Sequence, residues 1–347
     1  MRIPVHRRVS AVAYRRKSSV LKVPIPAKRC LLTFWIRNSA LKIWLLIASV
    51  AGALLVHSSV YAQQVGHYIG GATGLENGSD PPPGFFGTYV GLVNPVDSLK
   101  GPNGNTILNP DITVAAQMAG FAMVTPKKIL GADYGWTFIV PVVNTRFTAD
   151  QFNASAESGG LSDIFFSPIT LGWEKGKANF ILNYGFWAPT GDFDPSLALN
   201  PGLGFWEHQI EAGTTYALDK RKLWNTSLLT TWEINHSKMG LDVKPGPMFT
   251  GEYSFGRRFD KYQMNAGVVG YAYQKLSADS GSGINPLITG ILDRAFATGG
   301  EWKYTNLKWR MAFDVRYEQQ YGVEARTSGK IVVVTITYLK LFVPPHK

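Results

Sequence analysis

Apolar and polar residues alternate along one segment after another in the second half of this chain, and residues 307–318 show the pattern most plainly. The odd positions are apolar and the even positions are charged except for Ala312: Leu307, Trp309, Met311, Phe313, Val315 and Tyr317 against Lys308, Arg310, Asp314, Arg316 and Glu318. Side chains of a β-strand point to opposite faces with a period of two, so this segment has one apolar and one charged face. In a soluble sandwich the apolar face packs in the core. In an outer-membrane barrel it contacts lipid, and the charged face lines the lumen.

The first 62 residues have the three-part layout of an export signal. They hold 11 of the 35 Lys and Arg residues and no acidic residue, since the first one is Glu76. An apolar run at residues 43–56 follows the basic stretch, and Val60-Tyr61-Ala62 ends it with small residues at the spacing of a cleavage site. The run is shorter than the ~20 residues of a spanning helix. We therefore predict a signal peptide, residues 1–62, that is cleaved after Ala62.

Removing the leader changes what the composition implies. The full chain has a formal charge of +11, but residues 63–347 hold 24 basic and 24 acidic residues. The excess positive charge belongs to the export signal, so we predict no nucleic-acid partner. The one cysteine, Cys30, also lies in the leader. The mature chain therefore forms no disulfide and offers no thiol to a metal or a substrate.

The spacing of turn residues predicts twelve strands in residues 86–342. They are 86–93, 110–124, 131–146, 162–174, 178–187, 205–218, 223–236, 246–257, 262–275, 292–304, 307–320 and 329–342. Long connections (94–109, 147–161, 188–203, 237–245, 276–291 and 321–328) alternate with short ones (125–130, 175–177, 219–222, 258–261 and 305–306). Outer-membrane barrels have short periplasmic turns, longer outside loops and an even strand count. We predict an all-β fold, a transmembrane antiparallel β-barrel of about twelve strands.

The rest of the mature chain lies outside this predicted barrel. Residues 63–85 are rich in Gly and Pro and do not alternate. They either trail in the periplasm or fold into the lumen as a plug. Residues 343–347 form a short tail after the last strand, and no later apolar run is long enough for a membrane helix.

The hairpin around Thr305-Asn306 allows a specific prediction of register. A two-residue loop there pairs Trp302 with Trp309 on the outer face. It also sets Glu301 against Arg310 and Lys303 against Lys308 on the inner face, an attraction and a repulsion.

The candidate functional residues are charged positions on the predicted inner faces. They are Glu207, Glu211, Glu233, Glu252, Glu301, Lys308, Arg310, Asp314 and Arg316. Walls of opposite sign would create a transverse field that selects or orients solutes in a pore. The alternative is a charge ladder that fills and braces the interior.

A search for catalytic chemistry is mostly negative. His67, His208, His236 and His346 are dispersed and have no metal-ligand spacing. His236 and Ser237 are adjacent, so on a continuous strand they point to opposite faces and cannot act as base and nucleophile. Asp192 and Asp194 are more typical of a solvated loop than of a calcium site. We predict neither an enzyme nor a cofactor.

Several segments resemble a known family. They are Pro81-Pro82-Pro83-Gly84-Phe85-Phe86, the run from Ser162 to Trp173, Ala188-Pro189-Thr190-Gly191-Asp192, and the block from Trp224 through Glu233 and Pro245-Gly246 to Phe259. The family is that of outer-membrane transporters grouped with the meta-cleavage pathway of phenol degradation, and the resemblance spans roughly residues 67–342. It implies a barrel in the outer membrane of a Gram-negative bacterium that admits aromatic or other hydrophobic compounds. The family has no catalytic signature to carry over.

We therefore predict an outer-membrane channel for passive uptake of small hydrophobic or aromatic solutes. Its partners would be outer-membrane lipid and the solute. The alternatives are an outer-membrane hydrolase, a structural or adhesive barrel with a filled lumen, and a soluble periplasmic β protein.

Overall fold

The computed structural model describes residues 64–149, 154–284 and 290–342. The predicted signal peptide and the C-terminal tail lie outside these ranges. The described elements are β1 (Gly84–Lys100), β2 (Thr106–Leu108), β3 (Asp111–Ile129), β4 (Ala132–Ala149), β5 (Ala154–Leu161), β6 (Ile164–Lys175), β7 (Ala178–Ala188), β8 (Glu207–Ala217), β9 (Trp224–Asn235), β10 (Met248–Phe259), the 3-10 turn η2 (Asp260–Tyr262), β11 (Met264–Lys275), β12 (Arg294–Asn306), β13 (Met311–Glu324) and β14 (Thr327–Leu341). No helix in this part of the chain is long and apolar enough to cross a bilayer.

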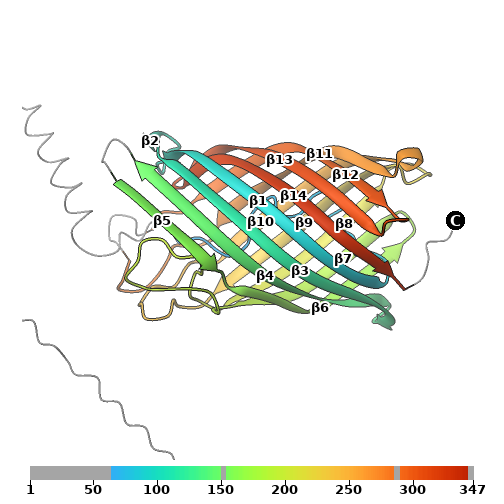
Figure 1. The fold of residues 1–347 in the computed structure, drawn as a ribbon, viewed down its shortest axis with the longest axis horizontal. Coiled ribbons are helices and arrows are strands. Elements are labelled where there is room, and N and C mark those ends of the chain that lie inside the picture. The colour runs from blue at the N-terminus through green and yellow to red at the C-terminus, as the bar shows by residue number, and fades with distance from the viewer. Residues whose placement is uncertain (1–63, 150–153, 285–289, 343–347) are drawn as a thin grey trace, which may run out of the picture. The chain divides into compact units, whose positions relative to one another are not determined.

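The strands form one closed antiparallel barrel (Figure 1). Each barrel strand pairs with the next along the chain, and β14 pairs back with β1 from Gly84↔Leu341 to Leu99↔Thr327. The short β2 pairs with β1, and β5 pairs with β4, so both lie outside the main circuit. The remaining strands make the predicted barrel of twelve, which is confirmed.

The two faces of the strands are sorted as a membrane barrel requires. On β9, Trp224, Leu228 and Trp232 are exposed, and Leu228 keeps 49% of its surface accessible. Thr231 and Glu233 on the opposite face are 0% and 1% exposed. Because the apolar side chains face outward and the polar ones inward, the soluble-sandwich alternative is wrong.

The connections also sort by length, with one exception to the prediction. The turns at 130–131, 176–177 and 307–310 lie at the same end of the barrel as Gly84 and Leu341, and the long connections lie at the other. The predicted long connection 321–328 is wrong, because β13 continues to Glu324 and β14 starts at Thr327. The tight turn between them is possible because Ala325 adopts a left-handed conformation, φ 54°.

The predicted register of the β12–β13 hairpin is wrong. Trp302 pairs with Val315, Glu301 with Arg316 and Lys303 with Asp314, because a longer turn at residues 307–310 replaces the two-residue loop. The pairing shifts by an even number of residues, so every strand side chain stays on its predicted face.

Lys308 and Arg310 fall in this turn and are exposed, and Arg310 has a φ of 56°. The prediction that these two residues line the lumen is therefore wrong.

Candidate functional site

The N-terminal segment, residues 64–83, runs through the lumen from the loop end of the barrel to the turn end. At the loop end, Lys275 Nζ donates to the carbonyl oxygen of Gln64 at 2.6 Å. At the turn end, the Phe342 N–H donates to the carbonyl oxygen of Pro83 at 3.0 Å. Between these points the segment lies against the inner faces of several strands, and the barrel proper starts at Gly84.

The inner-wall glutamates accept hydrogen bonds from the backbone of this segment. The donors and acceptors are His67 N to Glu207 (3.0 Å), Tyr68 N to Glu233 (3.1 Å), Gly71 N and Thr73 N to Glu252 (2.6 and 3.2 Å) and Leu75 N to Glu301 (2.7 Å). Arg316 Nη1 donates to the carbonyl oxygens of Gly71, at 2.7 Å, and Thr73. A buried segment without regular structure needs such partners, because each unpaired backbone group carries a desolvation cost.

The glycines of the segment allow it to lie this close to the wall. A Cβ atom at Gly78 would overlap the backbone of Thr214, and one at Gly74 would overlap the carboxylate of Glu301. The Gly-rich composition is thus a requirement of close packing at these positions.

The structure brings most of the predicted lumen residues together. Glu207, Glu233, Glu252, Glu301, Asp314 and Arg316 are buried on the inner wall, and Glu211 is there but partly exposed. Arg316 lies 3.5 Å from Glu301 and 3.4 Å from Asp314. With Lys308 and Arg310 in the exposed turn, the predicted positive wall does not form.

His67 anchors the segment at the loop end, a role that no motif in the sequence indicates. Its Nδ1 lies 2.9 Å from Glu207 Oε2 and its Nε2 lies 2.8 Å from Asp163 Oδ2. The ring stacks on Trp187, with centroids 5.1 Å apart and planes 9° apart. Burial alone would lower the pKa of His67, but the carboxylates of Glu207 and Asp163 outweigh it and raise the pKa. The partners are distant in sequence, so no spacing rule could have identified them.

An apolar cavity of about 590 Å³ remains beside the segment. Its apolar wall comes mainly from the inner faces of β1, β3 and β4: Val90, Leu92, Val114, Ala116, Met118, Val124, Ile139, Pro141 and Val143. On β4 the lining residues run from Gly135 to Thr145, which is roughly 33 Å of strand at ~3.3 Å per residue. The lining therefore extends along more than half of β4.

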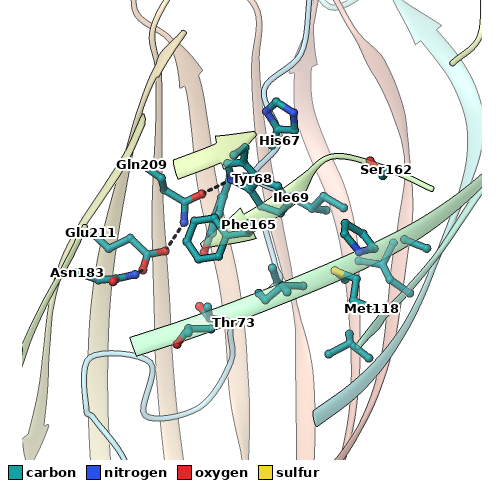
Figure 2. Close-up of a pocket in the computed structure, with 18 of the residues that line it drawn as sticks. His67, Tyr68, Ile69, Thr73, Met118, Ser162, Phe165, Asn183, Gln209 and Glu211 are labelled. Carbon is teal, nitrogen blue, oxygen red and sulfur yellow. Dashed lines mark hydrogen bonds between the residues drawn. The ribbon is translucent and has the colours of Figure 1, made fainter. Parts of the chain in front are cut away.

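A row of polar side chains interrupts the apolar lining on the side of β7 and β8. Figure 2 shows Asn183, Glu211 and Gln209 along one side of the pocket and Met118 on the other. Asn183 and Gln209 donate to the carboxylate of Glu211 at 2.6 and 2.9 Å. The alternation of apolar and polar residues did not identify these amides, because it indicates only which face a side chain occupies and not which inward polar residues contact a solute.

A β-bulge in β6 positions two hydroxyl groups that donate to Asn183. The register of β6 against β7 shifts between Phe166 and Ile169, around Pro168, which has no N–H to donate to the ladder. The inward positions change from Phe165 and Ser167 to Thr170. As a result the hydroxyls of Ser167 and Thr170 both donate to Asn183 Oδ1.

Among the described residues, no group of three or more His, Cys, Asp or Glu side chains could hold a metal ion. Asp192 accepts from the backbone N–H of Leu161, and Asp194 from Ser196, so both stabilise loop backbone.

A family model and several solved structures are similar to this chain. The family model described as "Putative MetA-pathway of phenol degradation" matches residues 96–336, well over half of the chain. An outer-membrane channel from Pseudomonas putida F1 has a TM-score of 0.65 and 12% sequence identity over 77% of this chain and 99% of that one. The β domain of the Bordetella autotransporter BrkA has a TM-score of 0.46 at 11% identity, over 73% and 99% of the two chains. A mutant of the monoaromatic hydrocarbon channel TodX has a TM-score of 0.37 at 12% identity, over 76% and 91%. A search of curated proteins found no match.

Proposed function

The chain belongs to the family described as "Putative MetA-pathway of phenol degradation", and from this premise we propose that it is a channel for passive entry of small hydrophobic or aromatic solutes. Its closed barrel with an apolar outer surface places it in the outer membrane of a Gram-negative bacterium. The observation that carries the proposal is the apolar cavity that follows β1, β3 and β4 along the lumen.

The cavity has the chemistry and size for such solutes. Porin interiors are polar because they conduct water and ions. Here a lining of Val, Ala, Met and Ile removes apolar solute surface from water, which is favourable by roughly 25 cal/mol per Å². A cavity of about 590 Å³ lies in the range of small-molecule pockets, roughly 300–1,000 Å³.

The N-terminal segment has a complementary role in this proposal, as a plug of the polar half of the lumen. It covers the charged side chains of β8, β9, β10 and β12, which would otherwise line a wet pore. The route left beside it is mostly apolar, so the channel favours hydrophobic solutes over ions.

Filling the cavity tests the proposal. Ala116 on β3 is 2% exposed and lines the cavity, whereas Ala119 on the same strand faces outward and is exposed. We expect Ala116→Trp to slow entry of the aromatic probe N-phenyl-1-naphthylamine into Gram-negative cells that express the chain, because the indole fills the route. Ala119→Trp, the matched control, should enter lipid and leave entry unchanged.

A buried tryptophan could also slow probe entry by disturbing the fold of the barrel. A cysteine variant that is blocked after folding separates these two effects. Because Cys30 is the one cysteine and lies in the leader, Ala116→Cys and Ala119→Cys each carry a single thiol in the mature chain. Blocking the Ala116→Cys thiol with a bulky reagent after folding should slow probe entry. Unchanged entry in both blocked Ala116→Cys and Ala116→Trp would contradict the channel and favour a barrel with a filled lumen.

A further inference from the structure

We propose that Glu211 is the polar end of a solute-binding site in the apolar cavity. The site takes a molecule with an apolar body and one hydrogen-bond donor, a hydroxyl or a protonated amine. This inference rests on the proposed function, because it names the chemistry of the solute that binds in the same cavity.

Two amide side chains hold the Glu211 carboxylate in a fixed orientation. Asn183 Nδ2 donates to its Oε2 at 2.6 Å, and Gln209 Nε2 donates to its Oε1 at 2.9 Å. Each amide is itself oriented by another donor. Thr170 donates to Asn183 Oδ1 at 3.0 Å, and Trp187 Nε1 donates to Gln209 Oε1 at 2.8 Å. With their carbonyl oxygens occupied, both amides present their N–H groups to Glu211.

The carboxylate keeps acceptor positions that no hydrogen bond within the described residues fills. A carboxylate has about four such positions. Within these residues its donors are the two amides and, at 3.5 Å, the Thr231 hydroxyl. None of the ion pairs in the described part of the chain includes Glu211. A charge in apolar surroundings is costly unless it is paired or hydrogen-bonded, so a donor from the solute is favourable here.

Glu211 is the most exposed member of this row, from which we infer that its free acceptor positions face the cavity. Gln209 and Asn183 are 3% and 8% exposed, whereas Glu211 remains partly exposed and lines the cavity. Phe165 and Met118 line the same cavity. We propose that a ring-sized molecule with its donor on Glu211 places its apolar body against this apolar lining.

Matched ligands test the site directly. Phenol and anisole differ in one methyl group, which removes the donor, and benzylamine carries a protonated amine. In titration calorimetry of the mature barrel in detergent micelles, we expect phenol and benzylamine to bind about tenfold more tightly than anisole, as for a hydrogen bond to a charged group. In Glu211→Gln this preference should fall to about twofold or less while anisole binding stays unchanged, and Glu211→Asp should retain it.

The results separate the role of Glu211 from the proposed channel function. Equal binding of phenol and anisole to the unmodified chain, or a preference that persists in Glu211→Gln, would overturn the role of Glu211. Anisole binding that Ala116→Trp abolishes would still support the apolar channel. If no ligand binds and Ala116→Trp leaves probe entry unchanged, the proposed function itself fails.

Discussion

At the scale of single residues, His67 is a titratable group that holds the N-terminal segment through two carboxylates. Its imidazolium bridges Asp163 and Glu207 at the loop end, and these carboxylates raise its pKa. Because the pKa of His67 is raised in the docked state, the protonated ring stabilises docking. This stabilisation is fully present at a pH below the unperturbed histidine pKa of ~6.5. That stabilisation is lost as the pH rises through the pKa of the docked state.

We therefore expect ionic conductance to rise with pH as the segment loosens. Single-channel recording from about pH 5 to about pH 9 brackets the unperturbed histidine pKa and measures this change. His67→Gln should abolish the pH dependence. The control His236→Gln should keep it, because His236 is exposed in a connection outside the lumen. A conductance that falls or stays constant with pH in the unmodified chain would contradict the anchoring role.

At the scale of elements, the N-terminal segment is held by glutamates on separate strands. Glu252 accepts three of the hydrogen bonds, from Gly71 N, Thr73 N and Thr73 Oγ1. Glu252→Ala leaves the N–H groups of Gly71 and Thr73 without their acceptor, at about 1–3 kcal/mol for each buried group. We expect the segment to detach more often and chymotrypsin to cleave after Tyr68 faster in reconstituted protein.

Glu174→Ala is the matched control for this cleavage assay. The Glu174 side chain is 71% exposed and pairs with Lys222 at the barrel surface, where an ion pair contributes at most about 1 kcal/mol. Its removal should leave cleavage at Tyr68 unchanged. Equal cleavage rates in the two variants would argue against docking through Glu252.

The faces and order of the strands were predictable because the period of two is local and repeats along each strand. Glu233 and Glu252 were placed on the correct face for this reason. Turn lengths were less predictable, since the left-handed conformation of Arg310 that shapes the turn at 307–310 is not visible in the alternation. The bulge at Ser167 and Pro168 likewise changes the parity of β6 without a break in the pattern.

The candidate site was predicted only in part. The inner-wall glutamates were named, but their partners are the backbone groups of residues 67–75, which belong to a segment with no periodicity. Such contacts join residues 140 or more positions apart, as His67 and Glu207 do, and depend on the closed barrel. The apolar wall of β1, β3 and β4 was not predictable from the alternation, because these strands carry apolar residues on both faces.

At the scale of the whole molecule, the central claim is that the lumen is divided lengthwise. The polar half holds residues 64–83, and the apolar half contains the cavity that we propose as the route for solutes. Under the proposed function, this division allows one barrel to carry buried charges and still favour hydrophobic molecules.

Single-channel conductance of the refolded mature chain, residues 63–347, tests this division most directly when compared with a variant that lacks residues 63–80. The account predicts small steps for the mature chain and clearly larger, cation-favouring steps for the variant, because the glutamates of β8, β9, β10 and β12 then line a wet pore. Heat-modifiable gel mobility checks that both barrels are folded. Equal conductance in two folded and inserted barrels would contradict the account.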